Sequence, residues 1–181
     1  MSNKTPPIKI KKPKGLPLSK KGYKKIKKGE ILHLTLSFIN DLRDINNLNL
    51  YIKQALAFFE EKPEMWDMQN DFELPLQNIF SLPQVRDIFS VDAKKVFIEK
   101  SILIPDKKNP ITIFRPDRVV LFKDYAVVVD FKSEKPSAPE VYSVYKRQIE
   151  NYCMIVKKLF QLPVVGYLLF ILEPELEMVV K

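Results

Sequence analysis

The stretch that decides the fold is ITIFRPDRVVLFKDYAVVVDFK, which forms residues 111–132 of a chain of 181 residues. Two apolar runs rich in β-branched residues flank a polar break at Lys123-Asp124, and this pattern predicts a β-hairpin. A two-residue turn at that break places Asp117 directly opposite Asp130. Lys132 lies two positions beyond Asp130 and therefore shares its face of the strand. The sequence thus predicts two carboxylates and one ammonium group on one face of an apolar hairpin.

These facing carboxylates need a compensating charge. Like charges directly opposite each other repel, and their burial is costly unless something neutralises them. The run Val127-Val128-Val129 indicates a buried central strand, where charged groups are rarely without a role. Carboxylate oxygens are hard ligands that suit Mg²⁺ or Mn²⁺. We therefore expect a divalent cation here; the alternative is a surface strand pair with ordinary solvated charges.

Helices and strands elsewhere in the chain predict an α/β domain. Apolar residues at three- and four-residue spacing predict helices over 19–42, 48–61, 72–80, 84–89 and 139–160. Alternating or continuous apolar runs predict further strands over 95–104, 164–172 and 175–180. A turn is expected over 105–110. This order predicts a central mixed β-sheet flanked by helices, with an N-terminal helical portion.

Positive charge is concentrated at the start of the chain. The net charge is +8, yet residues 1–29 hold eleven lysines and no acidic residue, so the remainder is slightly acidic. Residues 1–18 contain four prolines and read as a basic, flexible arm or linker ahead of a domain over 19–181. Such an arm favours phosphate backbones, with Lys9, Lys11, Lys12 and Lys14 as candidate contacts. The alternative is a solubilising tail or a plain linker.

Several classes of protein are disfavoured by the sequence. No apolar run is long enough to span a membrane, so we expect no membrane partner. The single cysteine, Cys153, cannot form an internal disulfide, and this is consistent with a cytoplasmic location. The sequence lacks the G-x-x-x-x-G-K-[ST] phosphate loop, so this chain is not itself an ATP-driven motor.

Four sets of residues resemble one nuclease superfamily. Asp117 followed by Asp130-Phe-Lys132 resembles the D…(D/E)-x-K signature of the PD-(D/E)xK, or restriction-endonuclease-like, nucleases. Gln148-Ile-Glu-Asn-Tyr152 is similar to the Q-x-x-x-Y element of its RecB-like branch, and Gly29-Glu-Ile-Leu-His33 to the upstream G-x-x-x-H element. The segment Arg115-Pro-Asp-Arg-Val-Val120 also resembles nuclease domains at the C-terminus of UvrD/AddA-type helicases. The resemblance covers roughly residues 19–172.

The resemblance implies a restriction-endonuclease-like fold and hydrolysis of DNA phosphodiesters with Mg²⁺ or Mn²⁺ as cofactor. It makes His33, Asp117, Asp130 and the backbone carbonyl of Phe131 the metal ligands. Lys132 would be the catalytic lysine. For His33 the alternative is a partly buried helix residue without a metal.

Five more residues are candidates through the same resemblance. Gln148 and Tyr152 lie four positions apart, on one face of a helix, and would support the catalytic lysine and the substrate or be ordinary polar caps on a core helix. Glu99, on the preceding strand, would be a neighbour of the metal or a plain strand-surface charge. Arg115 and Arg118 would contact phosphate or simply flank the site in solvent.

The leading functional hypothesis is an active DNA nuclease, an exonuclease working on single-stranded or unwound ends. Its expected partner is a superfamily 1 helicase, fused or separate, acting in DNA repair or recombination. One alternative is a catalytically silent DNA-binding module on the same fold, although a silent module has no reason to keep opposed carboxylates. The other is a restriction-type endonuclease, against which the Q-x-x-x-Y element and the upstream histidine argue.

Overall fold

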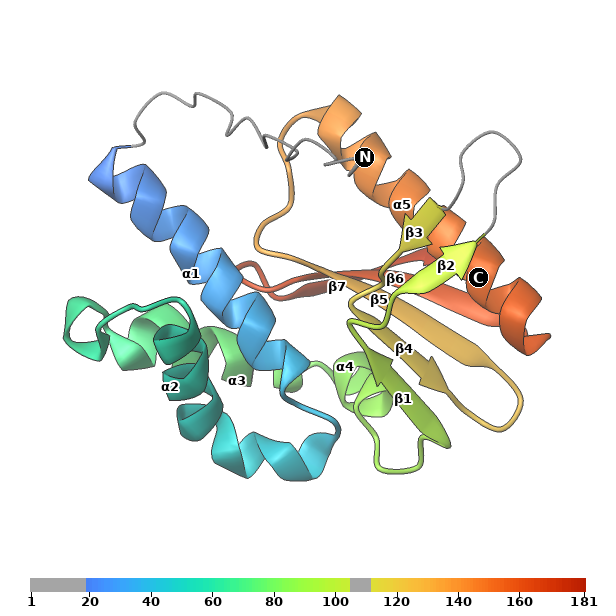
Figure 1. The fold of residues 1–181 in the computed structure, drawn as a ribbon, viewed down its shortest axis with the longest axis horizontal. Helices are drawn as coiled ribbons and strands as arrows, with labels where there is room; N and C mark the ends of the chain where they lie inside the picture. Colours follow the sequence, from blue (N-terminus) through green and yellow to red (C-terminus); the bar gives the residue numbers. More distant parts are fainter. Residues whose placement is uncertain (1–18, 105–111) are drawn as a thin grey trace, which may run out of the picture.

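The computed structural model describes residues 19–104 and 112–181, and it builds an α/β arrangement around a mixed sheet (Figure 1). The α-helices are α1 (Lys20–Ser37), α2 (Leu48–Phe58), α3 (Leu74–Phe80), α4 (Pro83–Ile88) and α5 (Pro139–Phe160). Short helical segments of other types are η1 (Leu42–Asn47), η2 (Pro63–Met65) and η3 (Met68–Glu73). The predicted arm over 1–18 and the predicted turn over 105–110 lie outside the described residues.

The strands form one mixed sheet and one separate ribbon. They are β1 (Lys95–Ile98), β2 (Ile102–Ile104), β3 (Thr112–Phe114), β4 (Arg118–Leu121), β5 (Ala126–Lys132), β6 (Val164–Phe170) and β7 (Glu175–Val180). The sheet has the order β1-β4-β5-β6-β7, with β5 and β6 parallel and the other neighbours antiparallel. β2 and β3 pair only with each other. The predicted mixed sheet flanked by helices is therefore confirmed.

The register of the predicted hairpin is confirmed. In the β4–β5 pair, Arg118 faces Val129 and Leu121 faces Ala126, as a two-residue turn requires. The backbone N–H of Phe122 donates to the carbonyl of Tyr125 across that turn at 2.9 Å. The turn thus lies at the polar break between two buried, mostly apolar strands, although Lys-Asp is not a favoured turn pair.

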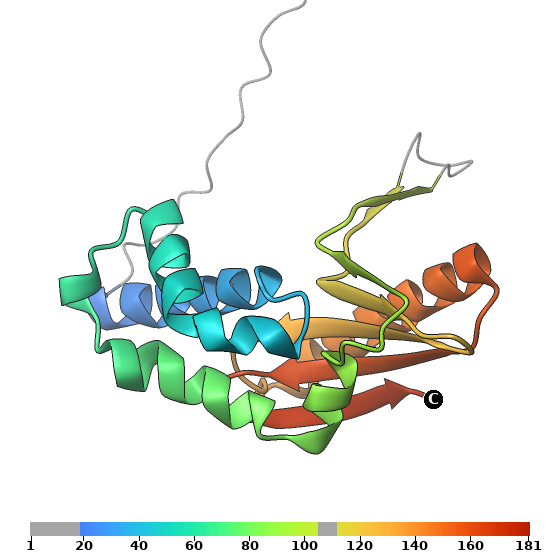
Figure 2. The same ribbon diagram turned by 90° about the horizontal axis from the view of Figure 1, so that it is seen from below.

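Two predicted strands are broken in the structure. The strand expected over 95–104 splits at Glu99, whose φ of 52° lies in the left-handed region and turns the chain out of the main sheet. The hairpin strand expected from residue 111 splits at Arg115–Asp117, where Pro116 has no N–H to continue a ladder. Both breaks have the same result, because they release β2 and β3 as a separate ribbon that projects away from the main sheet (Figure 2).

Two predicted helices end earlier than expected. The helix expected over 19–42 ends at Ser37, since the carbonyls of Ile39 and Asn40 bond to a buried arginine instead of continuing the helix. The helix expected over 48–61 ends at Phe58, before the left-handed residue Glu60. The predicted helix over 139–160 and the edge strand over 175–180 have their expected bounds.

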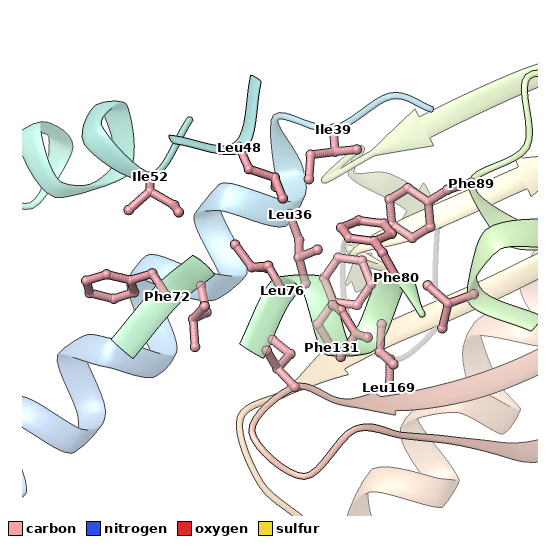
Figure 3. Packing of buried hydrophobic residues seen from close by; sticks show 14 of the residues in the cluster. Leu36, Ile39, Leu48, Ile52, Phe72, Leu76, Phe80, Phe89, Phe131 and Leu169 are labelled. Atoms are coloured by element: carbon pink, nitrogen blue, oxygen red, sulfur yellow. The ribbon is translucent and has the colours of Figure 1, made fainter. Parts of the chain in front are cut away.

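Side chains of β5 alternate between two hydrophobic cores. Val127, Val129 and Phe131 join the larger core, which α1 to α4 build on one face of the sheet (Figure 3). Ala126 and Val128 join the smaller core under α5 on the other face. The same alternation carries Asp130 and Lys132 toward the α5 face. Within the described ranges, no helix is both long and apolar enough to cross a membrane.

Candidate metal centre

Three chain segments meet where β4 begins. His33 comes from α1, Glu99 from the break after β1, and Asp117 from the residue just before β4. One potential ligand atom from each of the three lies within 4.8 Å of the other two. His33 Nε2 is 3.0 Å from Asp117 Oδ2, and His33 Nδ1 is 3.6 Å from Glu99 Oε1. The imidazole therefore lies between two carboxylates.

Asp117 is fixed by the strand beside it. Its Oδ2 accepts the backbone N–H of Phe131 at 2.6 Å, a hydrogen bond made where the regular β4–β5 pairing has ended. Its own carbonyl accepts the N–H of Glu99 at 3.0 Å. Asp117 thus joins the central strand and the break after β1 at one point, and its carboxylate is only 12% exposed.

Glu99 is directed to the site by its left-handed backbone. Such a conformation is unfavourable for a residue with a side chain and often marks a functional position. Its Oε2 pairs with Nε of Arg115 at 3.1 Å. Burial raises the pKa of the Glu99 carboxyl, and the negative charge of Asp117 raises it further. The Glu99 carboxylate is therefore half-buried, and the negative charge of Asp117 disfavours its ionised form.

His33 reaches the site because α1 approaches the end of β5 closely. A Cβ added at Gly29, one helical turn before His33, would clash with Oγ of Ser133 and lie 3.1 Å from its Cβ, so a larger residue there would require Ser133 to move. The imidazole packs edge-on against Phe131, with ring centroids 5.6 Å apart. Burial alone would lower the pKa of His33, but the hydrogen bond to Asp117 and the surrounding carboxylate charges raise it overall.

Asp130 and Lys132 form a buried ion pair beside this group. Asp130 is 2% exposed, and its Oδ2 lies 2.5 Å from Nζ of Lys132. Among the described residues this oxygen still receives no hydrogen bond of good geometry. Burial and the charge of Asp117 raise the pKa of Asp130 to about 6, against the opposing effect of Lys132. The three-residue group does not include Asp130, and its role as a ligand stays a prediction.

A hydrogen-bonded chain connects Lys132 to α5. Lys132 Nζ donates to Oε1 of Gln148 at 3.2 Å, and Nε2 of Gln148 donates to the hydroxyl of Tyr152 at 2.9 Å. That hydroxyl in turn donates to the carbonyl of Arg115 at 3.3 Å. The ammonium also lies over the ring of Tyr145, 4.4 Å from its centroid. Gln148 is therefore in contact with the predicted lysine, and Tyr152 is in contact with Gln148.

The backbone carbonyl of Phe131 has a suitable direction. The carbonyl of Lys132 accepts a hydrogen bond from Ile171, on the β6 side of the strand. Successive carbonyls in a strand point to opposite sides, so that of Phe131 points toward the β4 side, as its N–H does. Its role as a metal ligand also stays a prediction.

Arg118 is not a nucleic-acid contact, and this corrects the sequence analysis. The side chain is 1% exposed and donates to the carbonyls of Ile39 and Asn40 at 2.8 and 2.5 Å. Its guanidinium lies 3.8 Å from the ring centroid of Phe89. Burial lowers the pKa of Arg118 to about 9, so it remains charged at neutral pH. Arg118 anchors the chain after α1, whereas Arg115 is exposed as expected.

An open cleft of about 700 Å³ leads to the group. Its polar lining includes His33, Glu99, Arg115, Ser133 and Glu134. Its apolar lining comes from α1 and the end of α2 and includes Ile26, Leu34, Phe58 and Phe59. The four lysines predicted to contact DNA belong to the arm and lie outside the described residues.

Sequence reasoning missed several of these residues. The contact of Gly29 with Ser133 and the cleft position of Phe58 depend on tertiary packing, for which the sequence carries no local signal. The burial of Arg118 had a signal: in a strand, the neighbour of Asp117 points to the opposite face, here into the larger core. Ser133, which follows Lys132, lies against Gly29 because α1 approaches the end of β5 closely, and this approach also positions His33.

No protein-family model matches the sequence, and no curated protein shows significant similarity to it. The chemistry of the site must therefore be judged from its own residues. Two carboxylates and one imidazole are a donor set that suits Mn²⁺ and Mg²⁺ among divalent cations. The unsatisfied buried oxygen of Asp130 and the raised pKa of the Glu99 and Asp130 carboxyls show an environment that would favour a bound cation.

Proposed function

We propose that this protein is a divalent-metal-dependent phosphodiester hydrolase, a DNA nuclease with the restriction-endonuclease-like fold of the RecB-like branch. One observation carries the proposal: His33, Glu99 and Asp117 converge beside a buried Asp130–Lys132 pair, at the edge of a cleft. A carboxylate cluster alone would be weak support. The ammonium group of Lys132, held by hydrogen bonds through Gln148 and Tyr152, strengthens it, because a fixed cation can stabilise negative charge that develops on a reacting phosphate.

His33, Glu99 and Asp117 would hold the cation, with Asp130 and the Phe131 carbonyl as further ligands. When bound, Mg²⁺ or Mn²⁺ lowers the pKa of a coordinated water and neutralises charge on the phosphate. The protein ligands would determine where the cation lies. His33 must be neutral to act as a ligand, so proton uptake by the imidazole opposes metal binding.

Lys132 is the group that meets the reacting phosphate. Its ammonium is a compact cation that can donate to a phosphate oxygen as negative charge develops there. Asp130 and Gln148 hold it from two sides, while Tyr152 fixes the amide of Gln148. In the reaction, an oxygen from water bonds to phosphorus, the bond to one ester oxygen breaks, and that oxygen leaves as a hydroxyl with a proton.

The setting of this reaction extends the proposal. DNA is the proposed substrate, with exonucleolytic action on single-stranded or unwound ends. A superfamily 1 helicase, fused or separate, would supply such ends during repair or recombination in the cytoplasm. These elements rest on the resemblance of the sequence motifs to helicase-associated nuclease domains.

Cleavage of labelled single-stranded DNA by the purified full chain tests the proposal. Wild type should cleave with Mn²⁺ or Mg²⁺ and not in EDTA, and Lys132→Met should lose cleavage while retaining Mn²⁺ affinity. Lys157→Met, an exposed change in the last turn of α5 and outside the cleft, serves as the matched charge control and should remain active. DNA binding without metal-dependent cleavage would instead support a silent binding module. Cleavage of closed circular single strands would show endonuclease action.

A further inference from the structure

Phe58 has the most exposed large apolar side chain among the described residues, at 71%. It is the last residue of α2, directly before the partly buried Phe59. Burying a phenylalanine is one of the larger stabilising contributions that a side chain can make, so a core position would be favoured on stability alone. The fold does not use this ring for its own core.

The exposed ring belongs to the cleft that leads to the candidate metal centre. Phe58 and Phe59 line it together, with ring centroids 5.2 Å apart and planes at 89°. The ammonium of Lys27 lies over the ring of Phe59, 4.5 Å from its centroid. Apart from this edge contact with Phe59, no aromatic or cationic partner of Phe58 occurs over 19–104 and 112–181. A flat face of Phe58 is thus available to a ligand.

Charged groups line the same cleft. Lys25 pairs with Glu134 at 2.7 Å, and Arg115 pairs with Glu99 at 3.1 Å. The side chains of Lys25 and Arg115 are each 64% exposed. Each can therefore leave its acidic partner and bind a phosphate without any change in the packing of the core. A ligand in this cleft would meet an aromatic ring and ionic groups together. A nucleotide combines the matching features, a flat base and a phosphate.

We propose that Phe58 is a specificity-determining residue, which stacks on an unpaired base of a single-stranded nucleic acid held in this cleft. The inference rests on the proposed function, because it places the phosphate of that strand at the candidate metal centre. In a duplex each base has its faces covered by its neighbours in the stack. Away from the ends of a duplex, only an unpaired base can offer a face to Phe58, so the ring favours single strands and frayed ends over duplex.

Binding of a short fluorescent thymidine oligonucleotide to the full chain tests this role. Ca²⁺ replaces Mg²⁺ in the assay, since it takes the same oxygen ligands, and a gel checks that the strand stays intact. Loss of one base–aromatic stack should weaken binding roughly 5- to 150-fold in Phe58→Ala. Phe58→Leu should lose as much, because it keeps an apolar side chain and removes the aromatic face. Phe58→Trp should bind at least as tightly as wild type.

Two controls isolate stacking from other effects. Met65→Ala removes a side chain that is 68% exposed but does not line the cleft, so it should leave binding unchanged. A strand without bases should bind wild type and Phe58→Ala equally, because only the phosphate contacts remain. A duplex should bind wild type more weakly than the single strand and should be insensitive to Phe58→Ala.

Phe58→Leu that binds thymidine strands like wild type would overturn the stacking role and indicate a merely apolar contact. Equal losses on the thymidine strand, the strand without bases and the duplex would also overturn it. These failures differ from failure of the proposed function, in which wild type neither binds Mn²⁺ nor cleaves any strand. An active wild type whose single-strand binding ignores Phe58→Ala overturns the inference alone.

Discussion

At Asp130 a carboxylate is almost completely buried next to the charge of Asp117. The pKa of Asp130 is raised to about 6 from an ordinary value of 3.8, so the folded state binds the proton more readily than the unfolded state. Above about pH 6 the ionised group therefore destabilises the fold, and this penalty disappears as the pH falls toward 3.8. A group kept at such a cost is better explained by a function than by stability.

Asp130→Asn should consequently raise the stability of the metal-free protein at pH 7.5. A pKa displaced from 3.8 to about 6 corresponds to at most about 3 kcal/mol, and loss of the pairing with Lys132 will reduce the gain. Thermal melts in EDTA between pH 4 and 8 measure it, and the advantage of the mutant should shrink as the pH falls. The same mutant should lose cleavage. A mutant less stable than wild type at pH 7.5 would show that the ion pair is net stabilising.

Arg118 and Arg115 lie close together in the sequence but have different roles: Arg118 is structural, whereas Arg115 is exposed at the cleft. Arg118→Met should lower the free energy of unfolding by about 2–4 kcal/mol, because it leaves the carbonyls of Ile39 and Asn40 without their donor. Arg115→Met should change stability by less than about 0.5 kcal/mol, since its side chain is exposed. Urea denaturation of both mutants checks this. Similar losses in the two would contradict the assigned difference.

At the scale of elements, the approach of α1 to the end of β5 determines where His33 lies. Gly29→Ala should destabilise the protein, although alanine in a helix interior is normally better than glycine by about 1 kcal/mol. The added Cβ would clash with Oγ of Ser133 and lie 3.1 Å from its Cβ, and overpacking of this kind costs roughly 1–3 kcal/mol. Melting temperature and Mn²⁺ affinity should both fall.

Ser133→Gly provides the matched rescue for Gly29→Ala. It removes both atoms that the new Cβ would meet, so the double mutant should recover melting temperature and Mn²⁺ affinity relative to Gly29→Ala alone. A Gly29→Ala protein that is more stable than wild type would show that α1 can shift without affecting the site.

The sequence predicted elements where one local rule dominates. The β4–β5 register followed from the polar break at Lys123-Asp124 between two apolar runs, and the long helix from its periodic apolar face and its starting proline. The break at Glu99 could not be predicted, because glutamate gives no signal for a left-handed conformation within an apolar strand pattern. That conformation is stabilised by tertiary contacts, notably with Asp117 and Arg115.

In the candidate site, too, residues of one local element could be predicted together, whereas residues brought in by tertiary packing could not. Asp117, Asp130 and Lys132 were predicted together because they belong to one hairpin, where register alone determines their distances. His33 was placed with them only through a family resemblance, since 84 positions separate it from Asp117 in the sequence. The pairing of Glu99 with Arg115 and the burial of Arg118 required knowledge of how the layers pack.

At the scale of the whole molecule, we expect the basic arm to contribute to DNA affinity and the candidate site to carry out cleavage. Deletion of residues 1–18 removes Lys4, Lys9, Lys11, Lys12 and Lys14. If all five contact phosphates, the slope of log affinity against log salt for duplex DNA should become shallower by up to about 4, at about 0.9 per contact. Cleavage at saturating DNA should remain, because the candidate site lies within the described domain. An unchanged slope would make the arm a plain linker.

Calorimetric titration of wild type and His33→Ala with Mn²⁺ is the most direct test of the central claim, that this is a metal site. Wild type should bind Mn²⁺, and affinity should weaken as the pH falls through the raised pKa of His33, because a protonated imidazole cannot be a ligand. His33→Ala should lose more than about tenfold in Mn²⁺ affinity and less in Mg²⁺ affinity, since imidazole suits Mn²⁺ better. Wild type that binds no Mn²⁺, or a mutant that binds it equally and only melts lower, would contradict the account.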